Sequence, residues 1–414
     1  MKLSIIIPAY NEESAIFEIV QRCIDAKDYI CSHTSLTDIE IIVVDDGSRD
    51  HTFRISGEFK KLGKILLVSH EKNRGYGAAI KSGFEIASGE YVAFLDADGT
   101  CDPRYFVELF NKLEQNNADI SIGSRMRPDS EMPKMRKLGN LFYAALISLM
   151  GTSKITDAAS GMRILKKQSL EKIYPLPNGM NFTPAMSAKA VLDHRLKIVE
   201  CFMPYKERTG ESKLKVIRDG YRFLKTILEI SLFYKPFKIF FFCALALFAI
   251  SLFYGIPLLS FYFVNHRINE TDIYRIVSIM VMGILGVNLL LLGLIADKIV
   301  SIFTEGPVFY HRIKNRLLEN LLKPYYMAIS GSVLIFFGVI LNYKTIQEYL
   351  MFRTIHMHWS YVLVGAFLVL VGAEVIVYAF VQKLLLMYQE VLEFRKEWQK
   401  GQKQSEDKTP AIHE

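Results

Sequence analysis

The 414-residue sequence has few cysteines and no recognisable export signal. Its five cysteines show neither the paired spacing of a metal site nor a disulfide framework, and one lies inside a long apolar run. At the N-terminus, Pro8 ends a short apolar run at residues 3–7, so no signal peptide is expected. We therefore expect a reducing setting and a cytoplasmic N-terminus.

The signatures of two nucleotide-binding classes are missing. The glycine-bearing stretch at residues 73–79 lacks the Lys-Ser/Thr pair of a P-loop, and the first apolar run is not followed by GxGxxG. P-loop NTPases and dinucleotide-binding domains are therefore disfavoured. The net charge of +7 does not indicate nucleic acid either, because the basic residues lie beside apolar segments rather than among exposed aromatics. Anionic membrane lipids are the expected partner.

Apolar residues are abundant and unevenly distributed. They make up 51% of the chain, the mean hydropathy is +0.19, and the excess begins near Lys238. Four runs are close to the length of about 20 residues that crosses hydrocarbon. They cover residues 239–264, 273–295, 325–341 and 361–380, which predicts a transmembrane domain at 238–388 and a cytoplasmic tail at 389–414. The third run is short and contains Gly331 and Gly338, so a re-entrant segment is an alternative there.

Basic residues predict the orientation of these spans. The connection between the second and third runs and the C-terminal tail are rich in lysine and arginine, whereas the other two connections are poor in them. An even number of crossings with the basic segments inside predicts a multi-pass integral membrane protein. Its N-terminal domain and both termini are expected in the cytoplasm.

The N-terminal half alternates short β-branched runs with amphipathic stretches. The expected strands are residues 3–7, 39–44, 65–68, 91–95, 119–122 and 197–203, and the expected helices include 12–27, 75–87, 103–113, 140–150 and 183–192. This alternation predicts an α/β domain at residues 1–211, with a mainly parallel sheet that binds ligands at the carboxyl ends of its strands.

Residues 212–237 join the two expected domains. Apolar residues recur there at helical spacing and lysines and arginines occupy the other faces. We interpret the segment as an amphipathic helical region that lies on the membrane surface, since a predicted span follows it directly. A solvated helix packed on the sheet is the alternative.

Two carboxylates follow the hydrophobic strand expected at residues 91–95. Asp96 and Asp98 stand one residue apart, and a divalent cation such as Mn²⁺ or Mg²⁺ that bridges a diphosphate takes one or two carboxylate ligands from the protein. Such a cation would also neutralise charge on a departing nucleotide diphosphate. The alternative is a simple turn at Gly99, with Asp102 capping the next helix.

Other strand ends carry residues suited to a nucleotide. Tyr10 can stack on a base and Glu12 can accept hydrogen bonds from base or ribose, while Asp45 and Asp46 end the second strand. The backbone donors of residues 73–79 could approach a diphosphate or a sugar. Acidic residues at three strand ends are unusual for a purely structural edge.

These motifs resemble the family 2 glycosyltransferases of GT-A fold, and in particular the branch of dolichyl-phosphate mannose synthases and polyprenyl-phosphate glycosyltransferases. The resemblance covers residues 3–214 and rests on PAYNE at 8–12, VDDGS at 44–48, DAD at 96–98, GSR at 123–125, DAASGMR at 157–163 and RTGESKL at 208–214. It implies a Rossmann-like domain followed by about four membrane helices. It also implies transfer of a hexose from a UDP- or GDP-sugar to a lipid phosphate.

The resemblance implies roles for individual residues. Nucleotide binding falls to Pro8, Tyr10, Glu12, Asp45, Asp46 and Asp96, and metal binding to Asp96 and Asp98. An acceptor phosphate at a membrane surface needs fixed cations, for which arginine offers a suitable fork. The candidates are Arg125, Arg136, Arg163, Arg208, Ser212 and Lys213. Asp98, Arg125 and Asp157 are the expected catalytic residues.

A lipid phosphate can attack the anomeric carbon without a protein base, because it is already anionic near neutral pH. One displacement then inverts the anomeric centre. A hydroxyl acceptor, as in a glycolipid or diacylglycerol, would need a base, for which Asp157 is the candidate; a helix-capping or loop aspartate is the other interpretation of that residue. The Thr-Glu-Asp and Gln-x-x-Arg-Trp motifs of processive synthases are missing, which favours single transfer. A non-catalytic scaffold or translocase and a homo-oligomer both remain open.

Overall fold

The structure is a computed structural model that describes residues 1–127, 130–151, 153–205, 216–266, 268–304 and 316–406. The chain forms two compact units, Met1–Tyr234 and Lys235–Glu414. The boundary between them lies within the segment 212–237 that the sequence marks as a junction. Of the candidate site residues, Arg208, Ser212 and Lys213 lie outside the described residues.

The first unit is built on a seven-stranded sheet with the order β3-β2-β1-β4-β6-β5-β7. Its strands are β1 Lys2–Ala9, β2 Asp38–Asp45, β3 Leu66–Ser69, β4 Tyr91–Leu95, β5 Ile120–Ser124, β6 Met162–Lys166 and β7 Ile198–Phe202. β6 pairs antiparallel with β4 and β5, and the remaining pairs are parallel. The expected α/β class with a mainly parallel sheet is confirmed.

Strand β6 is the element that the sequence analysis missed. Its residues 162 and 163 belong to the motif at 157–163 that carries part of the family resemblance, and the strand has an arginine in its interior. An arginine in a strand buried on both faces contradicts the usual composition of such strands. Arg163 is nevertheless fully buried, opposite Phe94 of β4.

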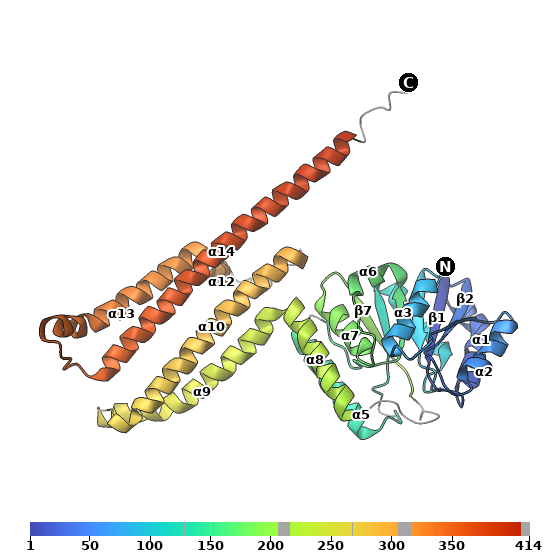
Figure 1. Cartoon of the computed structure of the whole chain (residues 1–414), viewed down its shortest axis with the longest axis horizontal. Helices are drawn as coiled ribbons and strands as arrows, with labels where there is room; N and C mark the ends of the chain where they lie inside the picture. Colours follow the sequence, from blue (N-terminus) through green and yellow to red (C-terminus); the bar gives the residue numbers. More distant parts are fainter. Residues whose placement is uncertain (128–129, 152, 206–215, 267, 305–315, 407–414) are drawn as a thin grey trace. The chain divides into compact units, whose positions relative to one another are not determined.

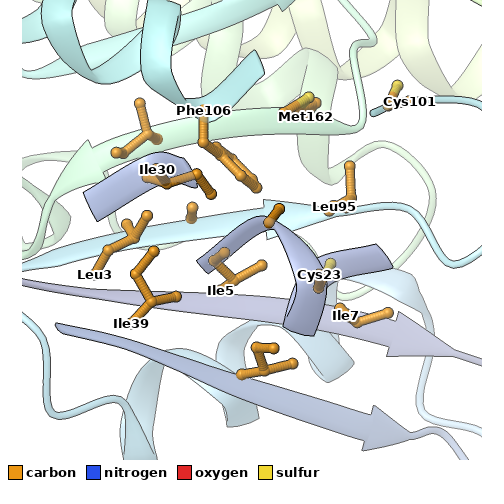
Figure 2. Close-up of a cluster of buried hydrophobic side chains, with 14 of the residues drawn as sticks. Leu3, Ile5, Ile7, Cys23, Ile30, Ile39, Leu95, Cys101, Phe106 and Met162 are labelled. Atoms are coloured by element: carbon orange, nitrogen blue, oxygen red, sulfur yellow. The ribbon is translucent and has the colours of Figure 1, made fainter. Parts of the chain in front are cut away.

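Helices cover both faces of the sheet. Alternate residues of β1, Leu3, Ile5 and Ile7, belong to one core together with residues of α1 (Ile16–His33), α2 (Thr52–Lys61) and α4 (Phe106–Gln115), part of which Figure 2 shows. Ile6 points to the other face, where its side chain meets Gly83 of α3 (Tyr76–Ile86). This period of two is the pattern expected of a strand covered on both faces.

Two helix starts differ from the expectations. Helix α1 begins at Ile16 rather than near Glu12, because the first turn after β1 holds Asn11 in a left-handed conformation, with φ of 51°. Helix α7 spans Phe182–Leu192 with Asn181 at its N-cap, so it begins one residue before the expected start at residue 183. Short helices follow β6: a 3-10 turn at Lys167–Ser169 and α6 at Leu170–Ile173.

Helices α5 (Lys134–Met150) and α8 (Val216–Tyr234) pack against each other in the first unit. The rings of Tyr143 and Phe223 meet edge to face with centroids 5.9 Å apart. The Tyr143 hydroxyl donates a hydrogen bond to the Gly220 carbonyl oxygen at 3.0 Å. The helix expected in the juxtamembrane segment is therefore present, and α5 begins six residues earlier than expected.

The second unit contains four helices long and apolar enough to cross a membrane among its described residues. They are α9 Pro236–Asn265, α10 Ile273–Thr304, α13 Pro324–Phe352 and α14 Trp359–Glu406, and a short helix, α12 Arg316–Leu321, precedes α13. In Figure 1, α9 runs beside α10 and α13 beside α14. α13 is continuous, so the structure does not support a re-entrant third segment.

Glycines explain how closely α13 and α14 approach. A side chain at Gly331 or Gly338 would collide with the carbonyl oxygens of Gly372 or Gly365, and the reverse also holds. Each helix thus presents two glycines seven residues apart to its neighbour. Small residues of this kind let helix backbones pack closely where no hydrophobic effect drives association, as in lipid.

Candidate active site

A pocket of about 520 Å³ opens at the carboxyl ends of β1 and β4 in the first unit. Its wall is formed by the loops after these strands, the start of α3, and helices α5, α7 and α8. Residues from 8 to 223 contribute, and all of them belong to one unit. Parallel α/β sheets bind ligands at this edge, so the position agrees with the expectation.

Asp96 and Asp98 both line this pocket. Asp96 Oδ1 accepts a hydrogen bond from the Tyr76 hydroxyl at 2.6 Å. Asp98 Oδ1 accepts from the Thr100 hydroxyl at 2.7 Å and from the Thr100 amide at 3.2 Å, across a turn in which Gly99 has φ of 75°. The turn and the Asp102 cap of the following 3-10 helix, Pro103–Tyr105, are also present, so the structural interpretation is confirmed. It does not compete with cation binding by Asp96 and Asp98, which stays a prediction.

The end of β1 and the loop after it bring three of the predicted nucleotide-binding residues to the same pocket: Pro8, Tyr10 and Glu12. This loop is tied to the loop after β2. The Asn11 amide donates to Ser48 Oγ at 2.9 Å, and the Glu12 amide donates to Thr52 Oγ1 at 2.8 Å. The two loops therefore form one hydrogen-bonded support for the aromatic ring and the carboxylate.

Asp46, rather than its neighbour Asp45, lines the pocket. Its carboxylate accepts hydrogen bonds from the amides of Arg74 and Gly75, each at 2.8 Å, and contacts His70 Nδ1 at 2.7 Å. It thus fixes the glycine-rich loop that opens α3. Nucleotide binding by Asp46 stays a prediction, whereas its hydrogen bonds to the loop are present in the structure.

Asp45 is buried beside the pocket. Its Oδ2 accepts from the Ser69 hydroxyl at 3.2 Å, while Oδ1 is buried and has no hydrogen-bond partner among the described residues. A buried carboxylate oxygen without a partner costs free energy unless a donor reaches it. Its assignment to the nucleotide stays a prediction.

Arg125 lines the pocket, and Asp157 lies behind it with no exposed surface. Asp157 accepts from Arg125 Nε at 2.7 Å, from Arg125 Nη2 at 2.9 Å and from Asn140 Nδ2 at 2.8 Å. Burial disfavours its charge, but the Arg125 guanidinium outweighs burial and holds the pKa of Asp157 below its usual value. A carboxylate held ionised and shielded in this way is a poor general base, so the base interpretation of Asp157 is not supported.

The other predicted cations divide into two groups. Arg136 lines the pocket, as expected. Arg163 does not: it is fully buried, and its guanidinium donates to the carbonyl oxygens of Ser160 and Ala158, each at 3.0 Å. Burial lowers the pKa of Arg163 to about 10. Because Arg163 has no exposed surface, it cannot contact an acceptor phosphate, and this assignment was wrong.

Several residues of the pocket were not singled out by the sequence. Tyr76 was part of a glycine-rich motif noticed only for its backbone, and Arg222 was one of several cations on the juxtamembrane helix. Tyr205 also lines the pocket, and the Arg125 guanidinium lies 5.6 Å from its ring centroid. Helical spacing could have indicated which face Arg222 occupies, but no signal in the sequence marks Tyr205.

The carboxylates fit a cation shared with a diphosphate. In the described parts of the chain, no cluster of three or more His, Cys, Asp or Glu residues could hold a metal by itself. Mg²⁺-type sites in phosphate-transferring enzymes use one or two carboxylates and complete their shell with substrate oxygens and water. Gly161 leaves room for the Asp96 carboxylate, which occupies the space that a Cβ at position 161 would fill.

Comparison with known proteins gives two family matches. Residues 4–174 match the model of glycosyl transferase family 2, and residues 236–394 match a domain of unknown function. The chain is 30% identical to a low-salt glycan biosynthesis hexosyltransferase of Haloferax volcanii over 55% of this chain and 53% of that protein. It is 30% identical to a UDP-N-acetylglucosamine--dolichyl-phosphate N-acetylglucosaminyltransferase of Methanococcus voltae over 40% of this chain and 70% of that protein.

A third relative is a dolichol-phosphate mannosyltransferase of Pyrococcus furiosus, 31% identical over 56% of this chain and 66% of that protein. The chain thus spans between about half and about two thirds of the length of these relatives. Among solved structures, a glucosyl-3-phosphoglycerate synthase from Mycobacterium tuberculosis with Mn²⁺ and UDP is 19% identical, with a TM-score of 0.42 over 56% of this chain and 80% of that one.

Proposed function

This chain belongs to glycosyl transferase family 2, and from that premise we propose that it transfers a single hexose from a UDP- or GDP-sugar to a polyprenyl or dolichyl phosphate. The observation that carries the proposal is the shared pocket. Tyr10 and Glu12 line it together with Asp96 and Asp98, so a single ligand could offer its nucleotide to the first pair and a metal-bound diphosphate to the second. The relatives named for dolichyl phosphate support the choice of acceptor.

The pocket also combines cations with apolar side chains, and we assign these residues to the acceptor. Arg125, Arg136 and Arg222 line it together with Met132 and Phe223. A phosphate on a hydrocarbon chain presents this combination of charge and apolar surface. The arginines would bind and orient the phosphate oxygen that attacks the anomeric carbon, which supports an inverting single displacement.

No protein base is needed in this reaction, because a phosphate monoester carries charge at neutral pH and has its second pKa at about 6. A hydroxyl acceptor would need a base. The candidate for that task, Asp157, is buried and bound to Arg125 and Asn140, so the structure favours the lipid phosphate over a glycolipid or diacylglycerol.

We propose a divalent cation, Mn²⁺ or Mg²⁺, as the cofactor. Asp96 and Asp98 would hold it, and when bound it supplies positive charge to the departing nucleotide diphosphate. Four apolar helices in the second unit support a membrane location. The distribution of basic residues supports a pocket on the cytoplasmic face with both termini on the same side.

The test is an acceptor comparison with the full-length chain in native membranes. Membranes are incubated with Mn²⁺, labelled UDP- or GDP-sugars, and polyprenyl phosphate, diacylglycerol or a neutral glycolipid. We expect a labelled lipid only with polyprenyl phosphate. A labelled neutral lipid would show that the proposed acceptor is wrong. If no labelled lipid forms with any combination of donor and acceptor, a non-catalytic scaffold or translocase is favoured instead.

A further inference from the structure

Tyr76 joins two parts of the pocket that are far apart in sequence. It is the first residue of α3, directly after the loop that Asp46 holds through the amides of Arg74 and Gly75. Its hydroxyl donates a hydrogen bond of 2.6 Å to Oδ1 of Asp96, which follows β4. A neutral donor to a carboxylate is one of the stronger hydrogen bonds in proteins.

The ring of Tyr76 is held in place. It meets the ring of Phe182 edge on, with centroids 6.4 Å apart and an interplanar angle of 76°. Phe182 in turn packs against Phe94 of β4. A Cβ at Gly77 would collide with Phe182 and with the Pro177 carbonyl oxygen, so the glycine leaves the room that this arrangement needs.

The Asp96 carboxylate is held from a second direction, because it packs directly on the backbone of Gly161. Between the Tyr76 hydroxyl and this backbone, the carboxylate has little freedom to rotate. A carboxylate oriented before its ligand arrives loses less conformational entropy on binding than one that must be ordered.

We propose that Tyr76 is a positioning residue that orients Asp96 for the divalent cation and couples this carboxylate to the glycine-rich loop. The inference rests on the proposed function, since it assumes a cation shared by Asp96 and a nucleotide diphosphate. Tyr76 does not itself bind the metal. It acts through the hydroxyl hydrogen bond, so removal of that single oxygen is the relevant change.

The chain offers a matched control in Tyr91. Its hydroxyl also donates a 2.6 Å hydrogen bond to a carboxylate, that of Glu114. Tyr91 is the first residue of β4, whereas Asp96 follows the end of that strand, so the two bonds lie at opposite ends of the same element. Tyr91→Phe removes a comparable bond away from the pocket.

The experiment measures binding of Mn²⁺ to the purified full-length chain in the presence of UDP or GDP, from the electron paramagnetic resonance signal of free Mn²⁺. We expect Tyr76→Phe to weaken Mn²⁺ binding about tenfold, the effect of losing one hydrogen bond to a charged group. Tyr91→Phe should bind Mn²⁺ like the wild type. Melting temperatures of the nucleotide-free proteins measure any general loss of stability in each variant.

Three results would overturn the inference. Unchanged Mn²⁺ binding in Tyr76→Phe would show that the hydroxyl does not orient Asp96. An equal loss in both variants would assign the effect to general destabilisation. If the wild type binds no Mn²⁺ with either nucleotide, the proposed cofactor is wrong and the inference falls with it. Mn²⁺ binding to the wild type therefore separates a failure of the proposed function from a failure of the inference about Tyr76.

Discussion

Arg125 and Asp157 form a two-pronged ion pair, with Nε 2.7 Å from Oδ2 and Nη2 2.9 Å from Oδ1. The Arg125 backbone amide also donates to Oδ2, at 3.0 Å. The carboxylate is buried, whereas the guanidinium reaches the pocket. Asp157 therefore fixes the direction in which Arg125 presents its charge, which is the task of a positioning residue.

Asp157→Asn should reduce transfer about 10- to 100-fold, because the Arg125 guanidinium loses its charged hydrogen-bond partner while the shape of the side chain at position 157 is kept. The measurement is kcat/KM for the lipid phosphate as a function of pH. We expect the acidic limb of the profile to stay where it is in the wild type. Residual activity whose profile has lost that limb would indicate that Asp157 acts as a general base.

Asp98→Asn should lower metal-dependent transfer at least about 100-fold, since an amide binds a divalent cation more weakly than a carboxylate and leaves charge on the leaving group uncompensated. The matched control is Asp102→Asn, because an asparagine can still cap the 3-10 helix. Initial rates are measured with Mn²⁺ and after addition of EDTA. Wild-type rates in Asp98→Asn, or activity that survives EDTA, would contradict metal binding at this position.

Gly161→Ala should abolish most transfer, because the new methyl group would displace the Asp96 carboxylate. Gly57→Ala in α2 serves as the control, since its added methyl meets no atom within 4 Å and an alanine favours the helix by about 0.5–1 kcal/mol. Activity and calorimetric melting temperature are compared for both variants. Full activity in Gly161→Ala would show that the position of Asp96 is not required.

The lowered pKa of Glu40 makes the stability of the folded chain depend on pH. Burial would raise its pKa, but hydrogen bonds from Ser4 and Ser88 outweigh burial and lower the pKa to about 2. The folded pKa lies below the unfolded value of about 4.3, so the ionised carboxylate stabilises the fold above pH 5 and this gain is lost as the pH falls towards 2.

Glu40→Gln should therefore destabilise the chain by about 1 kcal/mol at pH 7, an amount that allows for solvent screening of this partly exposed group. The melting temperatures of wild type and variant should converge as the pH falls from about 5 towards 2. Calorimetry of the detergent-solubilised full chain measures both. A difference that is constant over this range would contradict the ionised state of Glu40.

The sequence was informative wherever periodicity and strand ends carry the signal. Asp96 and Asp98 follow a hydrophobic run, and Tyr10 follows another, so the rule for parallel sheets predicted that they share one edge. The four helices long and apolar enough to cross a membrane were predicted because length and composition alone define such segments. Short loops between strands and helices make such predictions reliable.

The remaining errors concern side-chain partners, which depend on contacts between distant segments. In the sequence Asp157 resembles any other loop aspartate, because its partners come from distant segments: Arg125 follows β5 and Asn140 lies in α5. Arg163 carries the same charge as Arg136, yet one is inside the sheet and the other on the pocket wall. Strand β6 was not predicted because it contains a buried arginine. The carbonyl oxygens that accept hydrogen bonds from this arginine cannot be recognised from a local sequence pattern.

The most direct test is to identify the lipid formed when membranes containing the full chain receive a panel of labelled nucleotide-sugars, Mn²⁺ and polyprenyl phosphate. We predict one new product, a polyprenyl phosphate with a single hexose whose anomeric configuration is inverted relative to the donor. A retained configuration, a chain of several sugars, or the same product from membranes with Asp98→Asn would contradict the proposed transfer.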